Sequence, residues 1–100
     1  MKSQELLPDF SGKCLSITIQ DDSISHDLLN PRFEYQGGRL FIIGITPENA
    51  TASNWVAGCE SAIAWSRVTD YFVFENEEKY QAAIRKSEDY HKDDPKESGK

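Results

Sequence analysis

The sequence has few cysteines and no long apolar run. Its 100 residues include two cysteines, Cys14 and Cys59, which we interpret as reduced thiols rather than as a disulfide. No stretch approaches the roughly 18 apolar residues of a membrane-spanning helix. The first nine residues also lack the apolar segment of a secretory signal peptide, so we expect a cytoplasmic protein.

Positive charge is scarce as well. The chain carries 11 Lys and Arg residues against 17 Asp and Glu residues, which gives a formal net charge of −6. The acidic residues are spread along the chain rather than gathered at one end. Because such a surface would not neutralise phosphates or anionic lipid headgroups, we expect neither a nucleic acid nor a membrane as partner. A basic protein partner would fit this charge.

The motifs of several large enzyme classes are missing. The chain has no Gly-x-Gly-x-x-Gly, no phosphate-binding loop, no Gly-x-Ser-x-Gly and no Cys-x-x-Cys. We therefore predict no cofactor and assign no catalytic residue.

Two small groups of residues could still carry chemistry. His26 with Asp21, Asp22 and Asp27 offers metal ligands, but the spacing is not that of a known metal motif. Cys14 or Cys59 with His26 could form a thiol and base pair, although no local pattern supports one. We favour a solvated acidic turn and ordinary thiols.

The sequence is rich in short β-prone runs. Residues 13–20 alternate apolar and polar side chains, which is typical of a half-buried strand. Residues 31–36 and 39–46 flank Gly37-Gly38 and predict a tight hairpin. Residues 60–66 and 69–75 form a second pair of strands joined by a polar turn. Between the first strand and the hairpin, residues 24–29 are expected to form a helical turn or a loop that Asn30-Pro31 ends.

Two of these strands are apolar on both faces, namely residues 39–46 and 70–74. A strand of that kind is usually covered on both sides, so we place the two next to each other in the centre of the sheet. One helix is expected at residues 76–87, with Asn76 as its N-cap and Glu77 and Glu78 at the positive end of its dipole.

These elements predict an α+β fold. We expect a five-stranded, mainly antiparallel sheet that is strongly curved or closed into a small barrel, with one C-terminal helix. Residues 1–87 would form a single globular domain, and residues 88–100 a charged and disordered tail. Because one helix leaves apolar sheet surface uncovered, a homodimer is the simplest way to cover it, and closure of the barrel is the alternative.

Aromatic residues supply the candidate binding site. We favour Phe41, Phe72 and Tyr80 as core residues, and we assign another four aromatics to an interface or a pocket, where a carboxylate would supply counter-charge to a flat or cationic ligand. The predicted binding residues are Tyr35, Trp55, Trp65, Tyr71, Glu34 and Glu60.

Residues 32–44 and 62–74, the hairpin and the Ala62-Ile63-Ala64-Trp65 strand, carry a resemblance to a known group. With a compact hairpin, then this strand and then a short helix, the chain resembles small bacterial proteins that are carried as mobile gene cassettes in integrons. The resemblance implies a bacterial cytoplasmic accessory protein, often oligomeric. It carries over no catalytic residue, since that group shares no common active site.

Three functions remain open from the sequence. The first is a non-catalytic, acidic and dimeric interaction protein that engages a basic protein, as an immunity protein would. The second is a binding protein for a small organic ligand with an aromatic-lined cavity. The third is a small hydrolase or isomerase that uses carboxylates together with His26. A closed pocket that contains carboxylates of perturbed pKa would favour the second or third, and a flat apolar dimer face without a cavity would favour the first.

Overall fold

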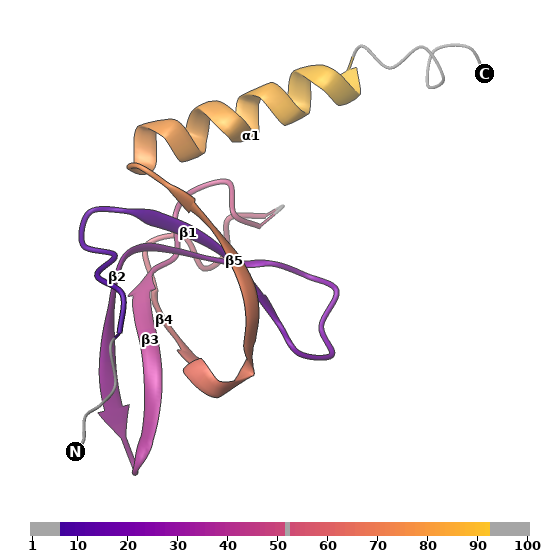
Figure 1. The fold of residues 1–100 in the computed structure, drawn as a ribbon. Helices are drawn as coiled ribbons and strands as arrows, with labels where there is room; N and C mark the ends of the chain where they lie inside the picture. Colours follow the sequence, from indigo (N-terminus) through magenta and orange to yellow (C-terminus); the bar gives the residue numbers. More distant parts are fainter. Residues whose placement is uncertain (1–6, 52, 93–100) are drawn as a thin grey trace.

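The computed structural model describes residues 7–51 and 53–92, with side chains up to residue 88. The described chain forms a five-stranded antiparallel sheet followed by one α-helix, as predicted (Figure 1). The elements in chain order are β1 (Cys14–Ile19), β2 (His26–Gln36), β3 (Arg39–Ile45), β4 (Glu60–Ala64), the short 3-10 helix η1 (Trp65–Arg67), β5 (Val68–Phe74) and α1 (Glu77–Lys92). No helix in this part of the chain has the length and hydropathy needed to span a bilayer.

The tight hairpin between β2 and β3 forms as predicted. Gln36 pairs with Arg39, and the two residues between them, Gly37 and Gly38, have φ angles of 59° and 83°. Both angles lie in the left-handed region, which costs glycine little and suits the twist of the flanking strands. The turn therefore fixes the register of the longest pair of strands in the sheet.

Strand β2 begins earlier than predicted, because residues 26–30 are strand rather than helical turn or loop. Asn30 and Pro31 bend the strand without ending it. The register shifts between Leu29 and Arg32, and Asn30 has a φ of 54°, so the extra residues form a bulge. A bulge tolerates proline, since no ladder hydrogen bond is needed there. The Asn30 side chain also accepts a hydrogen bond from the backbone N–H of Gly12, at 2.8 Å.

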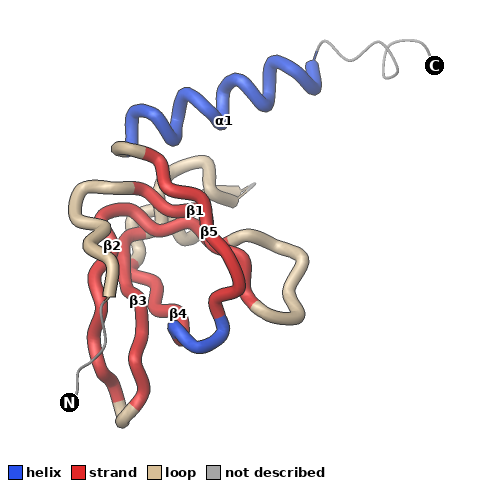
Figure 2. Tube along the Cα trace, viewed as in Figure 1, coloured by secondary structure: helices blue, strands red, loops and turns tan. Residues whose placement is uncertain are grey.

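The sheet is neither closed nor strongly curled, contrary to our prediction of a strongly curved sheet or a small barrel. Its strand order is β4-β3-β2-β1-β5, and among the described residues no ladder joins β4 to β5 (Figure 2). These two edge strands are nevertheless consecutive in the chain. The three residues of η1 connect them, so the edges come near each other at that end, while the sheet stays open along their length.

The central placement of residues 70–74 was also wrong. In the part of the chain that the structure describes, β5 pairs only with β1 and forms an edge, whereas β3 lies between β2 and β4. An edge strand has a neighbouring strand on one side only, so its apolar side chains are less covered. Phe72, which we expected in the core, is 67% exposed for this reason.

The hydrophobic core covers one face of the sheet, which we call the inner face. Cross-strand partners share a face, and the register of β1 with β2 and β5 puts Leu15 and Ile17 on it. The fully or nearly buried members of this core are Phe10, Leu15, Ile17, Leu28 and Ile42, with Ile19, Phe33, Ile63, Trp65 and Val68 packed against them.

Helix α1 covers part of the opposite, outer face. Asn76 caps it as predicted, because its side-chain oxygen accepts a hydrogen bond from the backbone N–H of Lys79 at 2.9 Å. Tyr80 is 2% exposed and packs edge-on against Phe74 of β5. Further along, the helix runs out beyond the sheet (Figure 1).

The helix ends at Lys92, five residues later than predicted. Residues 88–92 of the predicted disordered tail are therefore helical. Residues 93–100 lie outside the described part of the chain, so the tail and the domain boundary at residue 87 stay predictions.

Candidate functional site

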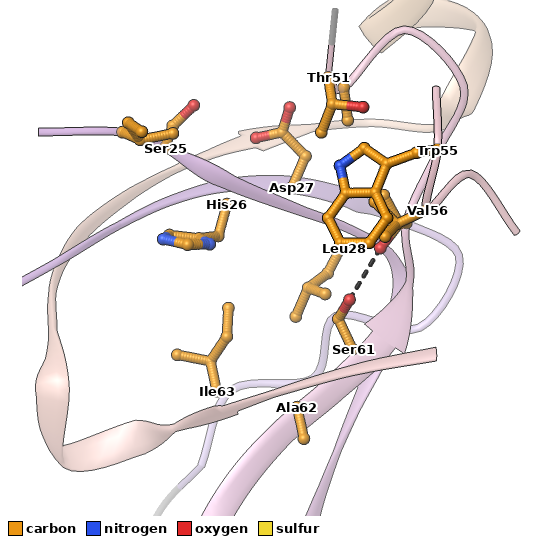
Figure 3. Close-up of a pocket in the computed structure, with 13 residues that line it drawn as sticks. Ser25, His26, Asp27, Leu28, Thr51, Trp55, Val56, Ser61, Ala62 and Ile63 are labelled. Carbon is orange, nitrogen blue, oxygen red and sulfur yellow. Dashed lines mark hydrogen bonds between the residues drawn. The ribbon is translucent and has the colours of Figure 1, made fainter. Parts of the chain in front are cut away.

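The candidate site is a pocket between the start of β2, the long loop after β3, and β4 (Figure 3). Its volume of about 640 Å³ lies within the range of small-molecule sites, roughly 300 to 1,000 Å³. We call it the Trp55 pocket. It is lined by Ile24, Ser25, His26, Asp27, Leu28, Thr46, Ala50, Thr51, Trp55, Val56, Ser61, Ala62 and Ile63.

The walls of the Trp55 pocket come from strands that are not neighbours. His26 and Leu28 belong to β2, Ile63 belongs to β4, and β3 runs between these two strands. Next to Leu28, strand β3 carries Gly44. A Cβ atom added to Gly44 would lie 2.9 Å from the Cβ of Leu28, so the missing side chain lets Leu28 pack closely over β3. The Leu28 side chain therefore fills the inner face at this position, and the Trp55 pocket lies beside Leu28.

One polar pair lies in the pocket wall. The hydroxyl groups of Thr46 and Ser61 are 2.8 Å apart and share a hydrogen bond (Figure 3). Thr46 is buried, with 6% of its surface exposed. Because these hydroxyl groups satisfy each other, they offer their remaining lone pairs to a ligand without leaving a buried group unpaired in its absence.

The loop of residues 47–59 forms the other wall and carries Trp55. Two backbone hydrogen bonds close its base, from the N–H of Thr46 to the carbonyl of Cys59 and from the N–H of Gly58 to the carbonyl of Thr46, each 2.8 Å long. Helix α1 holds the loop from outside, since the Gln81 side chain donates to the Glu48 carbonyl and accepts from the Asn49 amide. These hydrogen bonds hold the loop at its base and at Glu48 and Asn49, so Trp55 is presented in a defined position.

Trp55 is 78% exposed although it lines the pocket. An indole ring that is left in water at the mouth of a cavity gains contact area when a ligand arrives. Figure 3 shows its ring on the loop side, across the pocket from Ile63 and His26.

His26 faces the pocket from the opposite side and is held by a neighbouring turn. Its Nε2 atom lies 3.0 Å from Oδ2 of Asp22. The backbone N–H of Ile24 donates to the same carboxylate, and this bond together with His26 lowers the pKa of Asp22. The acidic turn therefore positions the imidazole, rather than being only a solvated turn.

Asp27 lies at the rim and turns its carboxylate toward helix α1. Its Oδ2 atom accepts a hydrogen bond of 2.5 Å from the hydroxyl of Tyr80, and its buried Oδ1 atom has no hydrogen-bond partner among the described residues. Burial and the Asp27 carboxylate raise the pKa of Tyr80. Cys14 is buried on the same outer face, where burial and the charges of Asp27 and Glu77 raise its pKa to about 12.

The six residues that the sequence suggested do not form one site. Trp55 lines the pocket, but Trp65 and Tyr71 belong to an aromatic cluster with Phe33 and Phe10, at ring distances of 4.9 Å and 5.3 Å respectively. Tyr35 lies near the β2–β3 turn and is 62% exposed.

The two carboxylates of the predicted site lie elsewhere. Glu34 and Glu60 share Arg32, at 3.3 Å and 3.0 Å, and these three side chains are exposed. Their strand positions put them on the outer face, and neither of them lines the Trp55 pocket. They are therefore paired with a cation already and do not supply counter-charge to this cavity.

The metal and thiol alternatives are not assembled. In the described residues no three His, Cys, Asp or Glu side chains group closely enough to hold a metal ion. His26 bonds to Asp22, but Asp27 bonds to Tyr80 and so does not join this pair. Cys14 faces the side of the sheet opposite His26, and Cys59 is exposed at the end of the loop.

Most lining residues could not be predicted from the sequence, because they come from three separate segments. Ser61 and Ile63 stand in ordinary strand positions and Thr46 directly follows β3, and only the strand order brings them near His26. The sequence does carry one signal, because the small side chains of Ala62 and Ala64 allow a close approach to this strand.

We compared the chain with protein-family models, curated proteins and solved structures, and none of them matches. The resemblance to integron cassette proteins stays a prediction.

Proposed function

We propose that this protein binds a small organic molecule in the Trp55 pocket. The observation that carries the proposal is the cavity itself, which is of ligand size and has an exposed indole ring at its mouth. Apolar walls from Leu28, Val56 and Ile63 supply burial, and the Thr46–Ser61 hydroxyl pair supplies hydrogen bonding.

The polar groups of the pocket favour binding over catalysis. In the described residues neither Ser61 nor Thr46 hydrogen-bonds to His26, so neither of these two hydroxyl groups is paired with the imidazole as a base. His26 interacts with Asp22, which orients the ring. Such an arrangement fixes a ligand's position but activates no nucleophile.

A neutral fluorescent dye tests the proposal. Phenylnaphthylamine is apolar, aromatic and small, and we expect its emission to rise on binding to the native protein with one site per chain. Replacing Trp55 with Ala should weaken this binding about fivefold to tenfold, since it removes an aromatic contact worth about 1 kcal/mol.

The matched control is Tyr35→Ala, which removes another exposed aromatic side chain at a distance from the pocket. This variant should bind the dye as the native protein does. Equal loss in both variants would indicate nonspecific association with surface aromatics and would contradict the proposal.

A second candidate is an interaction protein that pairs with a second copy through β5. The supporting observation is an apolar run on this free edge, where Tyr71, Phe72 and Val73 are 37%, 67% and 48% exposed. An uncovered edge strand offers unpaired backbone groups as well as these side chains to another strand. The net charge of −6 would still suit a basic protein elsewhere on the surface.

A further inference from the structure

A second, smaller pocket adjoins the Trp55 pocket along the free edge of β4. It has a volume of about 310 Å³, and we call it the Arg39 pocket. The two pockets share His26, Ala62 and Ile63, so they meet at these residues. The Arg39 pocket is lined by Ile19, His26, Arg39, Phe41, Ala62, Ile63, Ala64 and Arg67.

The two pockets differ in charge. The Arg39 pocket contains two guanidinium groups and no carboxylate, whereas the Trp55 pocket contains no guanidinium group and its carboxylate, Asp27, bonds to Tyr80. A molecule that lies across both would therefore meet an aromatic and apolar environment at one end and a cationic one at the other.

Among the described residues neither arginine of the Arg39 pocket forms a close ion pair with a carboxylate, although the charge of Arg67 contributes to lowering the pKa of Asp22, which bonds to His26. Arg67 donates from Nη2 to the backbone carbonyl of Gln20, and Arg39 lies 5.5 Å from the centre of the Phe41 ring. Each guanidinium group is thereby held in place while most of its N–H donors stay open. The contrast with Arg32, which binds two glutamates, is notable in a chain with 17 acidic residues.

We infer that the ligand is an organic anion, with an aromatic or apolar body in the Trp55 pocket and an acidic group between Arg39 and Arg67 in the Arg39 pocket. The inference rests on the proposed small-molecule function and adds the chemical class of the ligand. Guanidinium groups bind carboxylate, sulfonate and phosphate oxygens through paired N–H donors. The small side chains of Ala62 and Ala64 leave room for the ligand to pass along the edge of β4 from one pocket to the other.

A pair of dyes that differ only in charge tests the inference. Anilinonaphthalene sulfonate is phenylnaphthylamine with one added sulfonate group, so the sulfonate supplies the acidic group and the ring system the body. We expect Arg39→Gln to weaken binding of the sulfonate dye about fivefold to tenfold, the usual effect of losing one charge-assisted hydrogen bond at a partly exposed site. Binding of the neutral dye should change less than about twofold.

Two further variants complete the design. Arg67→Gln should act in the same direction as Arg39→Gln, and its circular dichroism spectrum shows whether loss of the bond to Gln20 disturbs the fold. Arg85→Gln is the matched control, because it removes one positive charge from the exposed part of α1. Binding of both dyes by this control should equal that of the native protein.

The outcomes separate the two proposals. Sulfonate-dye binding that neither Arg39→Gln nor Arg67→Gln weakens, while Trp55→Ala weakens the neutral dye, would overturn the anion inference and leave the proposed function standing. Equal loss in Arg85→Gln and Arg39→Gln would also overturn it, because the effect would then be one of net charge. If Trp55→Ala affects neither dye, the proposed function fails, and the inference fails with it.

Discussion

Tyr80 is the side chain that joins helix α1 to the sheet. Its ring packs on Phe74, and its hydroxyl donates to a carboxylate on β2, so one residue contacts two non-adjacent strands. A buried tyrosine that donates to a buried carboxylate satisfies two polar groups at once.

We expect Tyr80→Phe to destabilise the protein by about 1 to 3 kcal/mol, because Asp27 would then keep a buried carboxylate whose hydrogen bond is lost. Urea unfolding of the variant measures this difference. In a double-mutant cycle with Asp27→Asn, the two substitutions should couple by about 1 kcal/mol or more. Purely additive effects would show that the hydroxyl contributes through packing alone.

The two cysteines differ in reactivity for reasons of environment. Cys14 is fully buried, and burial together with nearby carboxylates raises its pKa to about 12, while Cys59 is exposed. Only the thiolate reacts with iodoacetamide, and a raised pKa keeps Cys14 protonated at every pH well below 12.

At about pH 8 we therefore expect one labelled cysteine per native chain, namely Cys59, and two in denaturant. Mass spectrometry of the labelled protein counts them and assigns the site. Equal labelling rates for Cys14 and Cys59 in the native protein would mean that the β1 strand opens readily or is not covered by α1.

At the scale of elements, the central hairpin depends on the close approach of β2 and β3 at Gly44. A Cβ atom there would lie 2.9 Å from Leu28 Cβ and 3.0 Å from the carbonyl oxygen of Leu29. Since the backbone of Leu29 cannot move without disturbing the bulge beside it, the position accepts no larger residue.

Gly44→Ala should accordingly cost about 1 to 3 kcal/mol of unfolding free energy, the usual range for an overpacked core. Thermal or urea unfolding gives the value. Gly37→Asn is a suitable control, because its site is open and asparagine tolerates a positive φ, so a change within about 0.5 kcal/mol is expected. A neutral Gly44→Ala variant would imply that the strands separate easily.

The elements themselves were largely readable from local sequence. Alternation, the Gly37-Gly38 turn and the Asn76 cap are signals carried by neighbouring residues, and they located all five strands and the start of the helix. The bulge at Asn30-Pro31 was misread as a break. A bulge and a strand end use the same residue types, and only the partner strand tells them apart.

At the scale of the whole molecule, local sequence patterns could not predict the order of the strands in the sheet. Residues 70–74 look like a central strand because both faces are apolar, yet the chain places them at an edge. Periodicity reports which side chains share a face and says nothing about which strand lies alongside. The same limit hid the Trp55 pocket, whose lining residues come from segments that only the sheet order brings together.

The exposed edge leads to a prediction about assembly. If β5 pairs with a second copy, light scattering should give the mass of two chains at high concentration and a falling mass on dilution. Phe72→Lys places a charge on this edge, and we expect it to yield a folded single chain. Tyr35→Lys introduces the same charge at another exposed aromatic and should leave the dimer intact. A native protein of single-chain mass at all concentrations would rule the dimer out.

The closed base of the loop at residues 47–59 has an evolutionary consequence. Hydrogen bonds between Thr46, Gly58 and Cys59 fasten both ends of the loop to the sheet, so the residues between them can change in type and number without altering the strands. The side of the cavity that carries Trp55 is therefore exchangeable, while the Arg39 side belongs to the scaffold. If the proposed anionic ligand binds here, substitutions in the loop alone would change the wall that meets its body and would leave Arg39 and Arg67 in place.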